Sequence, residues 1–275
     1  MTSDSHRSRH PVPVLLSTSA VYPEPTSVAF ELAAKLGYDG IEVMVWTDAV
    51  SQDPGALRGL AEHYNIPIGT VHAPCLLMTQ RVWSPDPWER LRRAIVMAEE
   101  LNAGTVILHP PFFWQREYAR TFGEGVRRLR AEHRAVRLAV ENMYWVKMAG
   151  RRFVPYSPDW DPTVAAGFDD YTLDISHCAA SGTDPLAMAE RMGANLTHLH
   201  LGDGRTAGRD EHLVPGHGDM PCAEVLQKVA ADGHLQSVGV EVTTRKMNRA
   251  DREAALAETL AFARGHLTVS STVDV

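Results

Sequence analysis

Short apolar runs alternate with longer amphipathic stretches along almost the whole chain. Eight runs rich in β-branched residues predict strands, at Val12–Ser17, Gly40–Val45, Pro67–His72, Thr105–His109, Arg137–Glu141, Tyr171–Asp174, Leu196–Leu201 and Ser237–Val242. Between them, apolar residues at three- and four-residue spacing predict helices at Ser27–Leu36, Pro54–Tyr64, Trp88–Leu101, Glu117–His133, Pro185–Met192, Cys222–Asp232 and Arg249–His266. The stretch after the fifth strand has the least distinct pattern.

Strict alternation of strands and helices predicts parallel strands, and eight repeats predict their closure into a barrel. We therefore expect an α/β protein with a single (β/α)8 TIM barrel over residues 12–268, a disordered N-terminal tail at 1–11 and a C-terminal tail at 269–275. An open doubly wound sheet would need a Gly-rich phosphate turn after an early strand, and LLSTSAVYPEP after the first strand is not one.

Composition and charge narrow the functional classes. The net charge of −7 argues against non-specific nucleic-acid binding, although a local basic groove stays compatible with it. No apolar run reaches the roughly 20 residues that span a membrane, and the start of the chain lacks the apolar stretch of a signal peptide. Three widely separated cysteines without a CxxC pair indicate free thiols in a reducing compartment. We expect a cytoplasmic location and no membrane partner.

Side chains that bind divalent metals occur just after successive predicted strands. There are nine: His72, His109, Glu141, Asp174, His177, His200, Asp210, His212 and Glu241. In a barrel the C-terminal ends of all strands open onto one mouth, so we expect these side chains to face one cavity. Asp210 and His212 belong to a long connection after the seventh strand that could fold back over the mouth.

Each of these residues also has an ordinary structural interpretation. A single His at a strand end is more often a hydrogen-bonded structural residue, and a buried Glu is as often a salt-bridge partner as a ligand. Six consecutive strands that end in a ligand-type residue are hard to obtain from packing alone, and this joint pattern favours a metal site. His198, which shares a strand face with His200, is expected one layer deeper in the barrel.

From LAAKLGYDGIEV to VEVTTR the chain resembles the xylose-isomerase-like barrel superfamily, which includes sugar isomerases, ketose epimerases, inosose dehydratases and the endonuclease IV group. The epimerase type holds one divalent ion with residues that match Glu141, Asp174, His200 and Glu241. The resemblance implies that the two glutamates act as acid and base and that His177 touches the substrate.

The endonuclease IV group binds three zinc ions with a larger ligand set. This chain matches the additional ligands as well, at His72, His109, His177, Asp210 and His212. The surrounding residues depart from that group. HAPC lacks the Tyr that follows the His after strand three in the repair enzymes, and ENMYWVKMAGRR replaces their Gly-rich polar turn.

Two functions therefore follow from the resemblance. We favour a metal-dependent sugar or sugar-phosphate isomerase or epimerase, in which Glu141 and Glu241 move a proton next to a carbonyl that the metal polarises. Trp114 and Trp145 would form a wall for the sugar, and Arg205 would hold a phosphate.

The alternative is a trinuclear-zinc phosphodiesterase of the endonuclease IV type, or a related small-molecule hydrolase or lyase. The cofactor is a divalent metal, with up to three zinc ions, or manganese or cobalt. The expected partner is a carbohydrate-like small molecule rather than nucleic acid. A homo-oligomer is open, because dimers and tetramers are common among such proteins.

Overall fold

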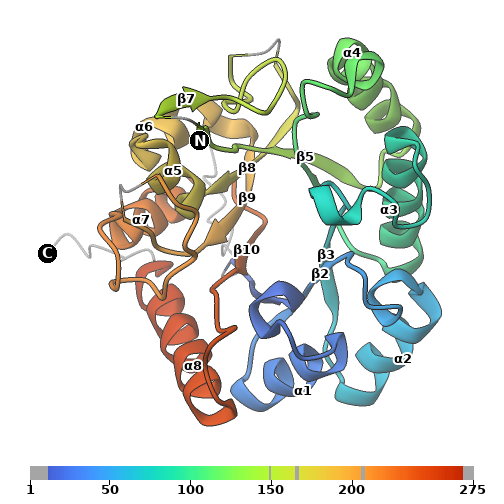
Figure 1. Cartoon of the computed structure of the whole chain (residues 1–275). Coiled ribbons are helices and arrows are strands. Elements are labelled where there is room, and N and C mark those ends of the chain that lie inside the picture. Colours follow the sequence, from blue (N-terminus) through green and yellow to red (C-terminus); the bar gives the residue numbers. More distant parts are fainter. Residues whose placement is uncertain (1–11, 149, 165–166, 206–207, 269–275) are drawn as a thin grey trace, which may run out of the picture.

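A closed barrel of eight parallel strands forms the centre of the computed structural model, which describes residues 12–148, 150–164, 167–205 and 208–268 (Figure 1). Its strands are β1 (Val14–Ser17), β2 (Gly40–Met44), β3 (Ile68–His72), β4 (Thr105–Leu108), β5 (Arg137–Glu141), β8 (Asp170–Asp174), β9 (Leu196–Leu201) and β10 (Ser237–Val240). They follow the order β1-β10-β9-β8-β5-β4-β3-β2 around the barrel. The predicted (β/α)8 fold is confirmed. The two predicted tails lie outside the described residues.

The helices form a ring around the barrel (Figure 1). Those that the sequence predicted are present with ends within one residue: α1 (Thr26–Leu36), α2 (Pro54–Tyr64), α3 (Pro87–Leu101), α4 (Arg116–Glu132), α6 (Pro185–Met192), α7 (Cys222–Asp232) and α8 (Arg249–His266). Three of them begin at a proline after a capping aspartate whose side chain accepts backbone N–H bonds, namely Asp53, Asp86 and Asp184. The seven-residue helix α5 (Ile175–Ser181) was not predicted.

The long connection after β5 contains an antiparallel hairpin, which the sequence did not predict. Its strands are β6 (Val146–Met148) and β7 (Arg151–Phe153), with Lys147 opposite Arg152. Beyond the hairpin, Tyr156 forms a β-bridge with Phe112 and packs with Met143 in a small separate apolar cluster. This cluster fixes the connection against the segment that follows β4.

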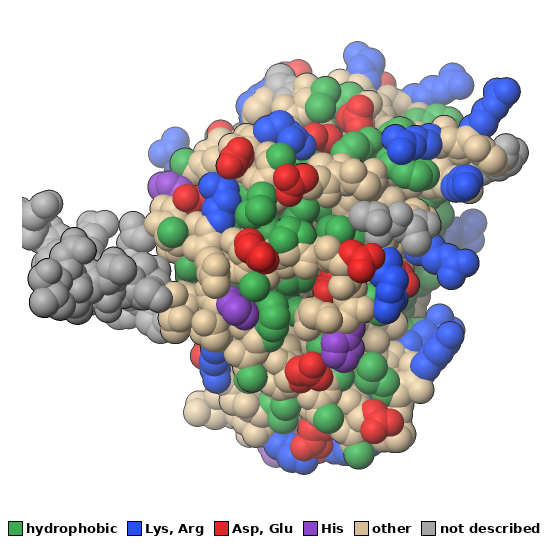
Figure 2. All heavy atoms as spheres, turned by 90° about the vertical axis from the view of Figure 1, so that its left-hand side faces the viewer, with side chains coloured by type: hydrophobic (Ala, Val, Ile, Leu, Met, Phe, Trp, Pro, Cys, Tyr) green, Lys and Arg blue, Asp and Glu red, His purple; other side chains and the backbone are tan. Residues whose placement is uncertain are grey.

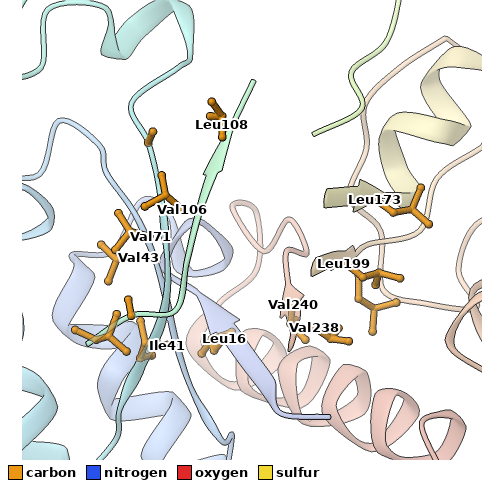
Figure 3. Packing of buried hydrophobic residues seen from close by; sticks show 14 of the residues in the cluster. Leu16, Ile41, Val43, Val71, Val106, Leu108, Leu173, Leu199, Val238 and Val240 are labelled. Atoms are coloured by element: carbon orange, nitrogen blue, oxygen red, sulfur yellow. The ribbon is translucent and has the colours of Figure 1, made fainter. Parts of the chain in front are cut away.

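The main core lies between the strands and the helices, because alternate strand residues face outward. Figure 3 shows such side chains from β1, β2, β3, β4, β8, β9 and β10, among them Leu16, Val43 and Leu199. Inside the barrel, toward the N-terminal ends of the strands, Leu15 packs so closely that a Cβ on Gly69 would lie 2.7 Å from its side chain. Toward the C-terminal ends, the interior carries polar side chains instead, and these lead to the C-terminal mouth.

Within the described residues, no helix combines the length and apolarity that crossing a membrane requires. The three cysteines, Cys75, Cys178 and Cys222, are free thiols.

Candidate metal centre

The structure brings all nine predicted ligands together at the C-terminal mouth of the barrel. Their ligand atoms form groups within which every atom lies within 4.8 Å of the others: Glu141, Asp174, His200 and Glu241; His72, His109 and Glu141; and Asp174, His177 and His212. The ninth residue, Asp210, adjoins the third group, with Oδ1 3.0 Å from Nε2 of His212. The strand register explains part of this, since Asp174 lies directly beside His200.

The four-residue group is drawn from β5, β8, β9 and the end of β10. Nδ1 of His200 lies 3.2 Å from Oε1 of Glu141, 3.5 Å from Oδ2 of Asp174 and 3.3 Å from Oε2 of Glu241. One N–H cannot serve three carboxylates, and Oδ2 of Asp174 is buried without a hydrogen-bond partner. Burying three carboxylates around one imidazole is costly unless a cation joins them. The donor set therefore fits a divalent metal ion.

Asp174 has two separate tasks. Its Oδ1 caps helix α5 by accepting the backbone N–H of His177 at 2.7 Å. Because capping occupies Oδ1, the unpartnered Oδ2 is the oxygen left for a metal. The same cap sets the first turn of α5, and that turn places the His177 ring beside the carboxylates, with Nδ1 3.1 Å from Oε1 of Glu141.

The second group pairs two imidazoles with the far oxygen of Glu141. Nε2 of His72 and Nε2 of His109 lie 3.2 Å apart, and they are 3.3 and 3.1 Å from Oε2 of Glu141. Ligand atoms around one tetrahedral zinc ion, with bonds of about 2.0–2.1 Å, are separated by roughly 3.3 Å. The spacing thus fits a metal ion, and Glu141 would bridge it to the four-residue group.

The third group depends on the connection between β9 and α7. Ser176, in the first turn of α5, donates its hydroxyl to Oδ1 of Asp210 at 2.9 Å and accepts the backbone N–H of His212 at 2.9 Å. His212 has a φ of 47°, in the left-handed region that a non-glycine residue rarely adopts. The side chains of Asp210 and His212 are 22% and 16% exposed, so this group lies at the open edge of the centre.

A buried aspartate organises the same connection. Asp203 accepts backbone N–H bonds from Gly204, Gly216, Gly218 and Met220 at 2.7–3.0 Å. A Cβ on Gly218 would lie 2.4 Å from Oδ1 of Asp203, so only glycine fits there. The GHG segment is thus needed to fold this connection over the mouth.

The close packing of carboxylates and imidazoles shifts the pKa values of both kinds of side chain. Burial raises the pKa of Glu141, but the imidazoles of His200 and His109 outweigh it and hold the pKa well below its usual range. Burial lowers the pKa of His212, but the carboxylates, Asp210 first among them, overcome it and raise the pKa to about 10. The pKa values of His177 and His200 are raised as well, so in the absence of a metal, protons on these three imidazoles balance the carboxylates. A divalent cation that binds here has to displace such protons.

A second polar layer lies directly below the four-residue group, and of its members the sequence predicted His198 but not Glu42. Oε1 of Glu42 lies 3.2 Å from Nε2 of His200, and its Oε2 lies 2.9 Å from Nε2 of His198 and accepts the Thr70 hydroxyl at 2.9 Å. His198 lies one layer below His200, as predicted, with Nδ1 2.8 Å from the Ser237 hydroxyl. A carboxylate behind a ligand histidine fixes its ring orientation and raises its basicity.

The sequence did contain a signal for Glu42. It stands between Ile41 and Val43, which face the helices, so it had to face the barrel interior. Glu141 and Glu241 each follow an apolar run in the same way, LAV and VGV. The atoms of Glu42, His198 and His200 also lie within 4.8 Å of one another, but all three residues are completely buried.

A cavity of 180 Å³ opens above the ligands. Apart from ligand residues, its lining consists of Ser19, Met44, Trp46, Leu76, Val242 and Thr243. Ser19, in the 3-10 helix η1 (Thr18–Val21), donates its hydroxyl to Oε1 of Glu241 at 2.8 Å. Trp46 supplies an aromatic wall for the cavity.

The three residues predicted to contact substrate do not line this cavity. Trp114 stacks on Phe112 and is 43% exposed. Trp145 donates its indole N–H to the Ser181 carbonyl at 2.7 Å and lies under the guanidinium of Arg152. Arg205 pairs with Glu211 and donates to the His217 carbonyl. The substrate role of the three stays a prediction.

Known proteins resemble this chain over most of its length. Protein Rv0498 of Mycobacterium tuberculosis is 46% identical over 279 residues, which cover 94% of this chain and 99% of that protein. Fructoselysine 3-epimerase of Shigella flexneri is 25% identical over 263 residues, covering 82% and 87%. The crystal structure of an AP endonuclease, family 2, from Brucella melitensis superposes with a TM-score of 0.68 at 15% identity, covering 91% and 98%.

The family assignment rests on a broader match. Residues 30–266 match the model of the xylose isomerase-like TIM barrel, which agrees with the closed barrel described above. The chain therefore belongs to the xylose isomerase-like TIM barrel family.

Proposed function

We propose that the protein is a divalent-metal-dependent sugar isomerase or epimerase that transfers a proton at the carbon next to a carbonyl. The observation that carries this proposal is the buried four-residue group, in which Glu141 and Glu241 flank His200 at 3.2 and 3.3 Å. Two carboxylates on either side of one site are what removing a proton and returning it elsewhere requires. The similarity to a fructoselysine 3-epimerase supports this reaction type.

The two glutamates differ in how free they are to act. Glu141 is 1% exposed, and its oxygens lie beside His72, His109 and His200. Both glutamates line the cavity, but the Glu241 side chain is 11% exposed and is oriented by the Ser19 hydroxyl. Glu241 is therefore better placed to take a proton from a substrate, and Glu141 to return it.

Glu141, Asp174, His200 and Glu241 would hold the metal ion. When bound there, a divalent ion supplies Lewis-acid polarisation of the substrate carbonyl and its neighbouring hydroxyl. Zinc, manganese and cobalt all accept mixed His and carboxylate ligands. Trp46 and Met44 form part of the cavity wall, where they would shield one face of a bound sugar from water.

Deuterium exchange tests the proposal directly. Protein stripped with a chelator and reloaded separately with manganese, cobalt or zinc is incubated with ketoses in D2O, and exchange next to the carbonyl is followed by NMR. We expect exchange that requires metal and is lost in Glu241→Gln. Glu258→Gln is the matched control, because Glu258 lies on α8 and forms an exposed ion pair with His217. Metal-loaded protein that exchanges no proton in any ketose, inosose or sugar phosphate would contradict the proposal.

The second candidate is hydrolysis of a phosphodiester by three metal ions. The group of His72, His109 and Glu141 favours it, because a one-metal epimerase has no use for two further imidazoles at ligand spacing. A polymeric substrate would also need a basic surface around the mouth. On the side of the barrel that Figure 2 shows, acidic and basic side chains are interspersed. Metal content of protein purified without added metal or chelator separates the candidates. About one ion per chain supports the epimerase, and about three zinc ions support the hydrolase.

A further inference from the structure

A second and larger hollow adjoins the metal cavity. It measures 560 Å³, and its wall shares Ser19, Met44 and Trp46 with the 180 Å³ cavity above the ligands. Pockets that hold small molecules usually measure about 300–1,000 Å³. The metal cavity alone falls below that range, and the adjoining hollow falls within it. A ligand bound at the metal centre can therefore extend past Trp46 into this second space.

The walls of the hollow combine flat and flexible apolar groups. The rings of Tyr22 and Trp46 lie 6.0 Å apart at 53°, and Met44 and Met78 lie on the same wall. Tyr22 is 40% exposed and Met78 is 64% exposed, although both are large apolar side chains. Exposed aromatic and methionine side chains around a hollow are typical of a surface that a ligand covers.

The charged groups of the hollow differ in whether they already have partners. Asp48 accepts the backbone N–H of Thr26 at 2.9 Å and that of Val50 at 3.2 Å. Glu24 lies 3.5 Å from Nη1 of Arg252.

Arg245 is exposed, and its guanidinium lies 5.3 Å from the Tyr22 ring centroid. Among the described residues, no carboxylate forms an ion pair with it. The other charged side chains that line the hollow, Glu24 and Asp48, are themselves anions. Arg245 is therefore the charged lining residue that can bind an anionic group.

We propose that this hollow binds the substituent of a substituted sugar, and that Arg245 binds an anionic group, a carboxylate or a phosphate, at the far end of that substituent. The inference rests on the proposed function, since the sugar ring would occupy the metal cavity. The linking part of the substituent would lie on Tyr22 and Trp46. The preferred substrate is then a ketose with an acidic substituent rather than a free ketose.

Matched substrates test this assignment. Fructose, fructose 6-phosphate, fructose bearing an aminohexanoate group on C1, and the carboxamide of that compound, which lacks the carboxylate charge, are compared for exchange kinetics and, in parallel, for binding by calorimetry. A charge-assisted hydrogen bond contributes about tenfold or more to binding. We expect kcat/KM at least about tenfold higher for the carboxylate or for the phosphate than for fructose or the amide, expressed mainly in KM. The preferred anion identifies the natural group.

Arg245→Gln should remove this preference by lowering kcat/KM of the anionic compound towards that of the amide, whereas Lys246→Gln, at the exposed neighbouring cation, should keep the preference. Equal kcat/KM and equal affinity for all four compounds, or a preference that survives in Arg245→Gln, would overturn the inference. Arg245-dependent binding without exchange in any sugar would overturn the proposed reaction and leave the anion site standing.

Discussion

Two groups in the candidate metal centre differ in construction. The four-residue group lies on neighbouring strands of the barrel, is buried, and is supported from below by Glu42. The outer ligands His177, Asp210 and His212 come from a short helix and a connection, and two of them are partly exposed. Barrel closure brings the four-residue group together and Glu42 and Ser19 orient its side chains, whereas the outer ligands depend on Asp203 and Ser176 holding the connection in place. The four-residue group therefore suits a required metal, and the outer ligands suit an addition that widens the chemistry.

Glu241→Gln should have the largest effect, because it removes a charge and a proton carrier while keeping the side-chain volume. We expect kcat to fall by about 10²–10⁴-fold, the range typical of lost acid–base catalysis. Steady-state kinetics at saturating metal measure it, and the melting temperature serves as the control for folding. Activity within threefold of the parent would remove Glu241 from the proposed chemistry.

Glu42→Gln should have the next largest effect, although Glu42 does not reach the cavity. Loss of the carboxylate behind His200 should weaken metal binding by about 10–100-fold. Competition with a chromogenic chelator measures the affinity independently of turnover. Thr70→Val, which removes one hydrogen bond to Glu42 and keeps its charge, is the matched comparison and should change the affinity less. Unchanged affinity in Glu42→Gln would show that the second layer only fills space.

His72→Ala and His109→Ala should each lower sugar turnover by less than about tenfold, because neither belongs to the four-residue group. The same changes should abolish a three-metal hydrolase. Turnover and metal content are therefore measured on the same samples. Loss of sugar turnover as complete as in Glu241→Gln would mean that His72 and His109 act together with the four-residue group.

Gly218→Ala should have the smallest effect on turnover. Its effect on stability should be confined to the connection between β9 and α7. The added Cβ would meet Asp203 at 2.4 Å and the Gly204 carbonyl at 2.6 Å, so the connection has to shift. We expect a cost of about 1–3 kcal/mol in the free energy of unfolding. Hydrogen exchange should increase in the connection between β9 and α7. Gly216 has a φ of 87° and no atom near its Cβ position, so Gly216→Ala tests backbone strain without the clash.

The sequence predicted the barrel well because its outward strand residues are almost uniformly apolar and its helices strongly amphipathic. It failed at α5, because Asp174 both ends a strand and caps the next helix, and ISHCAAS is buried throughout and has no polar face. It failed at the hairpin, because VKM and RRF are too short for a periodic pattern. Such short elements are fixed by tertiary contacts.

The candidate ligands were predictable for a related reason. Barrel topology turns their position after a strand into a position in space. Glu42 was missed because it lies within its strand. The sequence did not single out Trp46, Tyr22 or Arg245, because each belongs to a connection and no periodicity relates those connections to one another. The predicted aromatic wall of Trp114 and Trp145 lies outside the cavity lining, and its substrate role stays a prediction.

The buried layer around Glu42 has a consequence for protein engineering. Gly239 opposes this layer, and a Cβ there would lie 2.7 Å from Oε2 of Glu42 and 3.1 Å from Nε2 of His198. Transplanting only the nine mouth residues onto another barrel would therefore leave His200 without the carboxylate that fixes its orientation. A transplant that keeps the geometry has to include both layers, together with the glycine that leaves room for the lower one.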